Sequence, residues 1–366
     1  MGIVVQVGES PRSSQSRNPF FLCTELFTFM IKKTPAFILL VLLAIGTLAA
    51  AEPAYDFFVC ANINRNYVIG SKIVTTNGVF QRDAAGEWKH LGYNDTGISA
   101  VAFDPRDRNV IYTSALNGLW RSLDGGKLWR MCNDWDMTES RDVAVDPNAP
   151  DHVYLALPDG VAFSSDRAQT LVRRENGLPA RGKYTQVVQV DRTRAGRVLA
   201  GCELGVYLTE DAALHWRQVL PTKEMVFDIQ QSPHDPLVWL AVTQSVGAWR
   251  SLDGGLSWKQ LAAVPTTHPL YNITFDVTNP QRLAIGSWGL GALTSEDGGQ
   301  TWTDRNAGLP APHRVWRVGV DPVGQLYASV VAETLFVSSD FGRTWKPDSL
   351  VGSVVNKFLI QPKSAH

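Results

Sequence analysis

Four acidic residues are the candidates for acid–base chemistry in this 366-residue chain: Asp142, Glu203, Asp228 and Glu333. Glycoside hydrolysis needs two carboxyl groups roughly 5 to 9.5 Å apart, one acting as acid and the other as base or nucleophile. The four residues are widely separated in the sequence, so the sequence does not say which of them pair. Whether the protein is an enzyme is therefore left open at this stage.

Aromatic and basic residues form a second candidate set, which suits ligand binding. Aromatic rings stack on the apolar face of a sugar, and guanidinium groups bind carboxylates. Tyr271 beside Arg314 or Arg317 would also serve a polysaccharide lyase, with the tyrosine as base and the arginine neutralising a uronate. A hydrated channel rim is the alternative interpretation. The predicted substrate-binding residues are Arg65, Arg141, Tyr184, Tyr271, Trp288, Arg314, Trp316 and Arg317.

Other kinds of chemistry have no support in the sequence. The histidines show no metal-ligand spacing, and neither a Gly-x-Ser-x-Gly motif nor a phosphate-binding loop is present. We therefore expect no metal and no cofactor. The formal net charge is −1 and no basic stripe occurs, so the composition argues against a nucleic-acid partner.

A repeat positions these candidates. Its clearest copy is Ser-Glu-Asp-Gly-Gly-Gln-Thr-Trp at 295–302, with close copies at 122–129, 251–258 and 338–345. Two partly degenerate copies lie at 164–171 and 209–216, and the most degenerate copy lies at 82–88. Successive copies end 41 to 45 residues apart. A period of this length, with several short strands per repeat, predicts a β-propeller.

Each copy is expected to form a tight turn between two antiparallel strands. The glycines supply positive φ, and the Asp carboxylate accepts hydrogen bonds from the N–H groups of the turn. Asp124, Asp253, Asp297 and Asp340 are therefore predicted to be structural, because a calcium loop would need several oxygen ligands from each turn. The tryptophans that end the copies are predicted to pack between blades.

The repeats predict an all-β fold of seven four-stranded antiparallel blades without helices. Two strands precede the third strand and the turn in each repeat, and the first ends in Asp-Pro or a similar pair, as at Asp104-Pro105. The first blade lacks an innermost strand, and Val354–Pro362 is left over at the C-terminus. Pairing the two would close the ring. The candidate site residues then lie at the starts of innermost strands and on the loops of the face opposite the turns.

The N-terminal region has the features of an export signal. Residues 1–29 are predicted to be a disordered upstream extension, and residues 30–51 a secretory signal peptide. The signal has a basic start at Lys32-Lys33, an apolar run from Ala36 to Leu48 and small residues at 49–51. An uncleaved signal anchor is the alternative. Residues 52–366 would form one propeller, secreted or periplasmic, monomeric and without membrane contact after cleavage.

The repeated turn resembles the Asp-box, or BNR, repeat, and this resemblance covers nearly all of residues 56–362. The Asp-Pro and Asp-Gly-Gly segments of the repeats look most like those of the xyloglucanase-type glycoside hydrolases and the photosystem II assembly-factor propellers. Sortilin-type receptors and sialidases also carry such repeats. Xyloglucanase-type enzymes pair two propellers and have a catalytic Asp in the first blade. This chain has length for one propeller, and residues 74–80 contain no carboxylate.

Two functions from different classes follow. The first is an exported propeller that binds a polysaccharide or oligosaccharide, with or without cleaving it. The second is a non-catalytic scaffold that binds a protein, as the assembly-factor and sortilin-type propellers imply.

Overall fold

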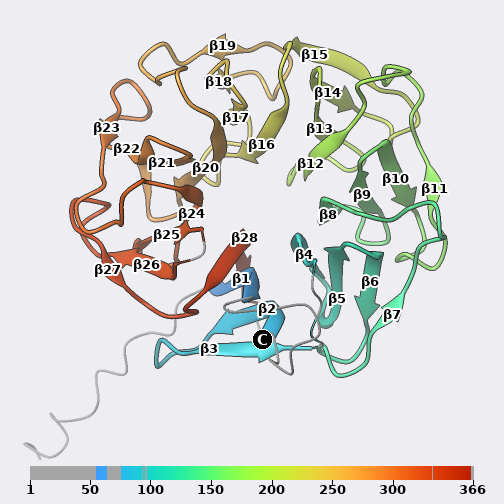
Figure 1. The fold of residues 1–366 in the computed structure, drawn as a ribbon. Coiled ribbons are helices and arrows are strands. Elements are labelled where there is room, and N and C mark those ends of the chain that lie inside the picture. Colours follow the sequence, from blue (N-terminus) through green and yellow to red (C-terminus); the bar gives the residue numbers. More distant parts are fainter. Residues whose placement is uncertain (1–54, 64–75, 93, 95–96, 332, 364–366) are drawn as a thin grey trace, which may run out of the picture. The chain divides into compact units, whose positions relative to one another are not determined.

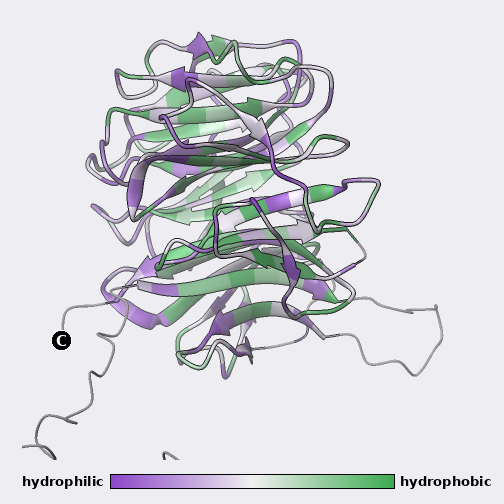
Figure 2. Ribbon diagram, turned by 90° about the vertical axis from the view of Figure 1, so that its left-hand side faces the viewer, coloured by the Kyte–Doolittle hydropathy of each residue, from purple (hydrophilic) through white to green (hydrophobic). Residues whose placement is uncertain are grey.

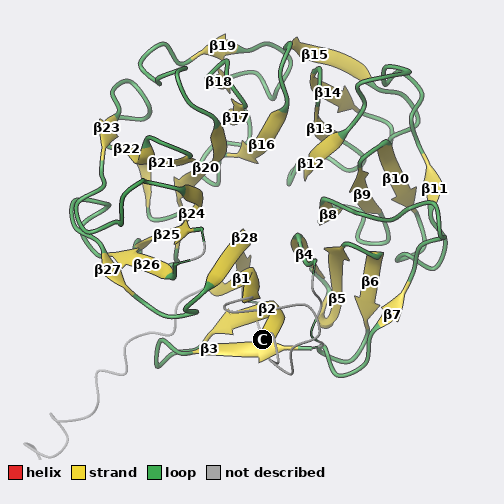
Figure 3. Cartoon of the chain, viewed as in Figure 1, coloured by secondary structure: helices red, strands yellow, loops and turns green. Residues whose placement is uncertain are grey.

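A computed structural model describes residues 55–63, 76–92, 94, 97–331 and 333–363. They belong to one compact unit, Pro53–His366. The described residues form strands and turns without a helix, as the sequence predicts (Figure 3). In this part of the chain, no helix is long and apolar enough to cross a membrane. Residues 1–29, the predicted signal peptide and Arg65 lie outside the described residues.

Seven four-stranded antiparallel sheets are arranged in a ring (Figure 1), which confirms the predicted seven-bladed propeller. Blade 1 contains β28 (Ser353–Pro362), β1 (Tyr55–Ile63), β2 (Thr76–Arg82) and β3 (Trp88–Leu91). The other blades follow in chain order, from the innermost strand outward. They are blade 2, β4 (Ala100–Asp104), β5 (Asp107–Ala115), β6 (Gly118–Ser122) and β7 (Arg130–Met131); blade 3, β8 (Asp142–Val145), β9 (Val153–Leu157), β10 (Gly160–Ser164) and β11 (Val172–Arg173); blade 4, β12 (Thr185–Val190), β13 (Val198–Cys202), β14 (Gly205–Thr209) and β15 (Arg217–Pro221); blade 5, β16 (Val226–Gln231), β17 (Trp239–Thr243), β18 (Ala248–Ser251) and β19 (Lys259–Gln260); blade 6, β20 (Leu270–Asp276), β21 (Asn279–Ser287), β22 (Gly291–Ser295) and β23 (Thr303–Asp304); and blade 7, β24 (Val315–Val320), β25 (Leu326–Val330), β26 (Leu335–Ser338) and β27 (Lys346–Pro347).

The C-terminal strand closes the ring. β28 pairs with β1 from Tyr55↔Pro362 to Ile63↔Ser353, so the last strand of the chain is the innermost strand of the first blade. This pairing confirms the closure expected from the leftover C-terminal segment. It gives the first blade the same four strands as the others and covers the inner edge of β1.

Apolar side chains between neighbouring blades form the core. β9, β13 and β17 are buried throughout, because each is covered by a blade on both faces. Trp216 of blade 4 packs with Tyr154 and Phe163 of blade 3, and Trp345 of blade 7 packs with Leu309. Figure 2 shows hydrophobic segments running through the stacked strands. The tryptophans that end these two turns therefore stabilise blade–blade contacts, as the sequence predicts.

The repeated turns are held by their aspartates. In blade 6, Asp297 Oδ1 accepts the Ser295 hydroxyl at 2.8 Å and the N–H groups of Gln300 and Thr301, both at 2.9 Å. The Thr301 hydroxyl donates to Asp297 Oδ2 at 2.6 Å. These bonds, led by the one from Thr301, lower the pKa of Asp297 to about 2. The carboxylate is thus fully engaged within its own turn.

The two partly degenerate turns, at 164–171 and 209–216, keep the same backbone conformation without glycines. Gly298 and Gly299 have φ of 70° and 87°, and the corresponding Ala212 and Ala213 have φ of 57° and 64°. An L-residue in this left-handed region is strained by about 1 to 2 kcal/mol. The packing of the blades therefore holds the backbone of these turns in the left-handed conformation despite the strain.

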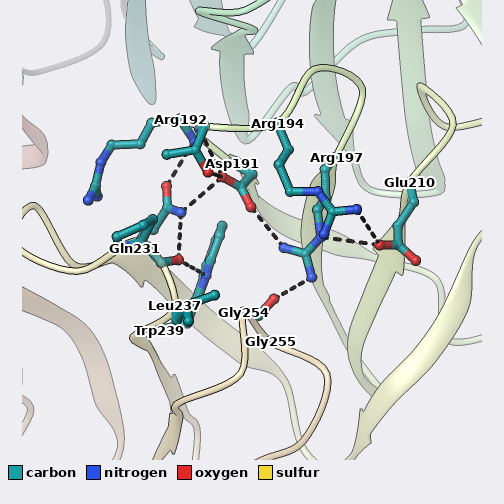
Figure 4. Close-up of polar contacts among 12 residues, drawn as sticks. Asp191, Arg192, Arg194, Arg197, Glu210, Gln231, Leu237, Trp239, Gly254 and Gly255 are labelled. Carbon is teal, nitrogen blue, oxygen red and sulfur yellow. Dashed lines mark hydrogen bonds and ion pairs between the residues drawn. The ribbon is translucent and has the colours of Figure 1, made fainter.

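A buried arginine joins blades 4 and 5 (Figure 4). Arg197 lies 3.0 Å from Asp191 Oδ2 and donates to the carbonyl of Gly254 in the repeated turn of blade 5. Gln231 of blade 5 donates to Asp191 Oδ1 at 3.1 Å. This network has no opening to a ligand, because Arg197 and Asp191 are both nearly inaccessible to solvent. We therefore assign it a structural role.

Candidate functional site

Most innermost strands carry a β-bulge at the same level of the central channel. The strand register shifts near the channel-side start of β12, β16, β20 and β24 and at the equivalent residue of β28. A bulge leaves that residue unpaired and re-aims its side chain. Arg141 and Ser99 hold the corresponding position at the start of the innermost strands of blades 3 and 2. We call these seven residues the bulge ring: Ser99, Arg141, Gln186, Phe227, Tyr271, Trp316 and Asn356.

One side of the bulge ring is aromatic. The Tyr271 ring lies 5.0 Å from Phe227 and 4.4 Å from Trp316, as centroid distances. Trp288, on the loop after β21, lies 6.3 Å from Tyr271 and is 38% exposed. Blades 5, 6 and 7 thus place four aromatic side chains in one continuous arc, and three of them were predicted from the sequence.

Arginines cover the faces of these rings. The Arg314 guanidinium lies 5.6 Å from the Trp288 ring centroid, and Arg317 lies 4.9 Å from that of Trp316. On the other side of the bulge ring, the Arg141 guanidinium lies 5.3 Å from the Tyr184 ring centroid. Such stacking is favourable, since the ring quadrupole attracts the cation. Six of the predicted substrate-binding residues that the structure describes therefore belong to these aromatic–arginine contacts, and the seventh, Tyr271, contacts the rings of Trp288 and Trp316.

The other side of the bulge ring is polar. Asn356 accepts the Trp316 indole N–H at 3.1 Å and donates to the Ile98 carbonyl at 2.8 Å. The closing strand therefore joins the aromatic arc of blade 7 to blade 2. Gln186 continues the polar side next to Arg141, and both line the central cavity.

The residues directly after the bulges link neighbouring blades. Asp142 Oδ2 accepts the Val188 N–H of blade 4 at 3.2 Å, and Asp228 Oδ2 accepts the Ile273 N–H of blade 6 at 3.1 Å. Asn272 bonds both the N–H and the carbonyl of Val318, at 2.9 and 2.7 Å. Each innermost strand is the edge of its sheet, so part of its backbone has no strand partner, and these side chains of the neighbouring blade satisfy it.

Charged groups meet at the centre of the channel. Lys357 Nζ lies 3.1 Å from Asp142 Oδ1. Burial lowers the pKa of Lys357, but Asp142 and Asp228 more than offset this, so the pKa is raised and the ammonium stays charged. Arg317 donates to the Tyr271 and Asn356 carbonyls, and burial lowers its pKa. Two cations thus face two acidic side chains inside the channel, although burial still raises the pKa of Asp142 despite its contact with Lys357.

A cavity of about 340 Å³ opens at this level. Six members of the bulge ring line it, together with Asp142, Asp228, Arg317 and Lys357. A volume of this size suits a side chain or a small ligand group. Among the described residues, no group of three or more His, Cys, Asp or Glu side chains is placed to hold a metal.

The four predicted catalytic carboxylates do not come together. Asp142 and Asp228 line the cavity, in blades 3 and 5. Glu203 and Glu333 are exposed on loops of blades 4 and 7, and neither lines the cavity. Sequence reasoning missed Gln186, Phe227, Asn356 and Lys357. Aligning the starts of all innermost strands would have found them, since each occupies the position of Trp316 or Arg317.

Comparison with known proteins finds similarity to this chain at the level of the fold. No family model matches it, and no curated protein matches it. The GH74 xyloglucanase from Xanthomonas campestris superposes with a TM-score of 0.62 and 18% identity, covering 80% of this chain and 55% of that chain. A GH74 enzyme from Niastella koreensis gives 0.64 and 16%, covering 80% and 52%. This chain therefore spans about half the length of these enzymes.

The second group of similar structures consists of YCF48 propellers. YCF48 bound to a D1 peptide superposes with a TM-score of 0.53 and 18% identity, covering 70% of this chain and 83% of that chain. YCF48 from Cyanidioschyzon merolae gives 0.53 and 16%, covering 70% and 87%. Both kinds of propeller named from the repeats are thus structural neighbours. At these identities the likeness shows the fold alone.

Proposed function

We propose that this protein is a non-catalytic binding propeller that holds a peptide segment of a partner protein at the bulge ring. The observation that carries this proposal is the arrangement of Trp288, Tyr271 and Trp316 with Arg314 and Arg317. Tryptophan, tyrosine and arginine are the residues that dominate protein–protein binding energy.

The carboxylates favour binding over hydrolysis. Asp142 and Asp228 each accept a backbone N–H of the next blade, and Asp142 also pairs with Lys357. A general acid or nucleophile must be free to reach the scissile bond. Asp142 and Asp228 instead maintain the ring, and the exposed Glu203 and Glu333 lie on blades separated by two others.

The aromatic faces favour a peptide over a sugar. A sugar stacks on an open ring face, whereas an arginine already occupies one face of Trp288 and one face of Trp316. The comparison with a single-propeller protein solved with a peptide points the same way, because this chain covers 83% of that protein. Oligosaccharide binding is the second candidate, favoured by the Gln186 and Asn356 amides beside the aromatic arc.

Export belongs to the same proposal. Residues 30–51 have the composition of a signal peptide, so we propose that the partner is met outside the cytoplasm. Fusing residues 1–60 to a reporter that is active only after export would test this. A reporter that stays inactive and intracellular would contradict it.

The experiment for the binding function compares two ligand panels on the purified protein. Random peptides displayed on phage would be selected in parallel with affinity electrophoresis on plant, algal and bacterial polysaccharides. We expect peptide enrichment, and at least about tenfold weaker binding of the selected peptide by the Trp316→Ala variant. Leu256→Ala, an exposed change in the repeated turn of blade 5, is the control that keeps binding.

The other outcomes are equally informative. Polysaccharide binding that Trp316→Ala abolishes, without peptide enrichment, would replace the peptide by a sugar. Release of oligosaccharide products would overturn the non-catalytic assignment. Peptides that bind the Trp316→Ala and native proteins equally would place the site elsewhere.

A further inference from the structure

The outer edge of blade 2 exposes four large apolar side chains along one continuous stretch of chain. Leu123 and Leu128 of the repeated turn are 58% and 75% exposed, Met131 of β7 is 47% exposed, and Trp135 after β7 is 90% exposed. The outermost strands of blades 5, 6 and 7 instead present Lys259–Gln260, Thr303–Asp304 and Lys346–Pro347. Other blades also expose single apolar residues, such as Leu252 and Leu256 in the turn of blade 5, but blade 2 adds Met131 and Trp135 beyond its turn. Contiguous exposed apolar side chains mark interaction sites.

Leu128 occupies a position where the fold prefers a hydroxyl. In four other repeated turns a Ser or Thr at this position donates to the second carboxylate oxygen of the Asp, at 2.5 to 2.7 Å. Leu128 cannot make this bond, and its side chain is left in solvent. The leucine therefore does not serve the turn, and we look for its role at the surface.

Trp135 is presented by a fixed turn. Met137 donates its N–H to the Asp134 carbonyl at 3.1 Å, and its side chain is buried. Arg173 of β11 donates to the Asp136 carbonyl at 2.7 Å and pairs with its carboxylate. Because the backbone around Trp135 is already fixed, burial of this residue by a partner costs little backbone entropy.

The charges along this edge are self-complementary. Lys127 and Arg130 lie toward the repeated turn, and Asp134 lies at the opposite end, beside Trp135. Within the described part of the chain, none of these three forms a salt bridge. When two such edges meet head to tail across a two-fold axis, the Lys127 and Arg130 side chains of one face the Asp134 of the other. An isologous interface has this self-complementary property.

We propose that a second copy of this chain docks on the outer edge of blade 2, giving a two-fold dimer through Leu128, Met131 and Trp135. This differs from the monomer expected from the sequence, because the exposure of these side chains depends on the tertiary structure. The dimer leaves both bulge rings open, since β7 is the outermost strand of its blade (Figure 1). The edge is narrow, so the dimer is a weak one.

Light scattering coupled to size exclusion, with loading from about 1 to about 200 µM, would detect such a weak dimer. The native protein shifts from monomer to dimer with concentration. Trp135→Ser and Leu128→Thr both stay monomeric over this range. Leu128→Thr is the decisive variant, because its hydroxyl restores the bond to Asp124 and its melting temperature is equal to or above that of the native protein. Loss of the dimer then cannot be attributed to unfolding.

The charge arrangement has its own test. Lys127→Glu combined with Arg130→Glu gives a monomeric chain, and Asp134→Lys gives another. Mixing the two variants restores pairing between the unlike chains. A native protein that remains monomeric up to the highest concentration would overturn the proposal. A dimer that survives Trp135→Ser or Leu128→Thr would overturn it equally.

Discussion

The Lys357 ammonium lies 3.1 Å from the Asp142 carboxylate, although 215 residues separate them in the sequence. Asp142 belongs to blade 3, and Lys357 comes from the strand that closes blade 1. The pair therefore links blade 1 to blade 3, which are not neighbours in the ring. Lys357 reaches Asp142 only when the C-terminal strand closes the ring, so the charge balance of the channel depends on this closure.

The first prediction concerns this pair. Lys357→Met leaves the buried Asp142 carboxylate without its cation, which should lower the free energy of unfolding by about 3 kcal/mol. Urea denaturation measures the change. Asp142→Asn in the Lys357→Met background should recover part of the loss, because the amide oxygen still accepts the Val188 N–H. Additive effects of the two substitutions would show that the pair is not coupled.

The second prediction concerns the closing strand. Deleting residues 353–366 removes the innermost strand of blade 1 together with Asn356 and Lys357. We expect loss of cooperative thermal unfolding and of the near-ultraviolet circular dichroism signal, because β1 then has an open edge next to apolar core residues. A synthetic peptide of residues 351–363 should restore part of the signal. A truncated chain that melts cooperatively at the native temperature would contradict this role.

The third prediction concerns a strained turn. Ala212→Gly should raise the free energy of unfolding by about 0.5 to 1 kcal/mol, because glycine adopts the φ of 57° without steric strain. Ala102→Gly, in the extended strand β4, is the matched control and should be destabilising by about 1 kcal/mol. Equal destabilisation by both substitutions would show that the strain at Ala212 is absent.

The fourth prediction concerns acid stability. The pKa values of Asp166, Asp253, Asp297 and Asp340 are lowered to about 2, from an ordinary 3.8. Their contribution to stability is complete above about pH 4 and is lost as the pH falls toward about 2, since protonation breaks the turn hydrogen bonds. Melting temperatures recorded across this window should fall steeply.

The Asp297→Asn variant isolates one turn of this set. Its amide has no carboxyl proton to gain, so its melting temperature should depend less on pH than that of the native protein in the same window. Parallel pH profiles for the two proteins would show that Asp297 contributes nothing to acid sensitivity.

The sequence by itself determined the fold to the level of individual blades. Local hydrogen bonds and positive-φ residues define the turns, such as Asp297 with Thr301, so their signal lies within eight consecutive residues. Repetition at 41 to 45 residues then set the blade number, and the unmatched segment 354–362 indicated the closure. Tyr271 and Trp316 were also found, because they stand at equivalent places in successive repeats, and Trp288 was found on the loop after the second strand of its repeat.

Only the tertiary structure decided what the channel residues do. Asp142 and Asp228 are residues of a type that can act as catalytic acids. In the structure, both bond to the backbone of a neighbouring blade, and Asp142 also pairs with a lysine from the closing strand. The bulges at Gln186, Phe227 and Asn356 have no signal within a single strand, because a bulge depends on the register of two paired strands, and only an alignment of several repeats marks these positions. The same holds for Trp135, whose exposure is set by how the neighbouring blade packs and not by the residues beside it.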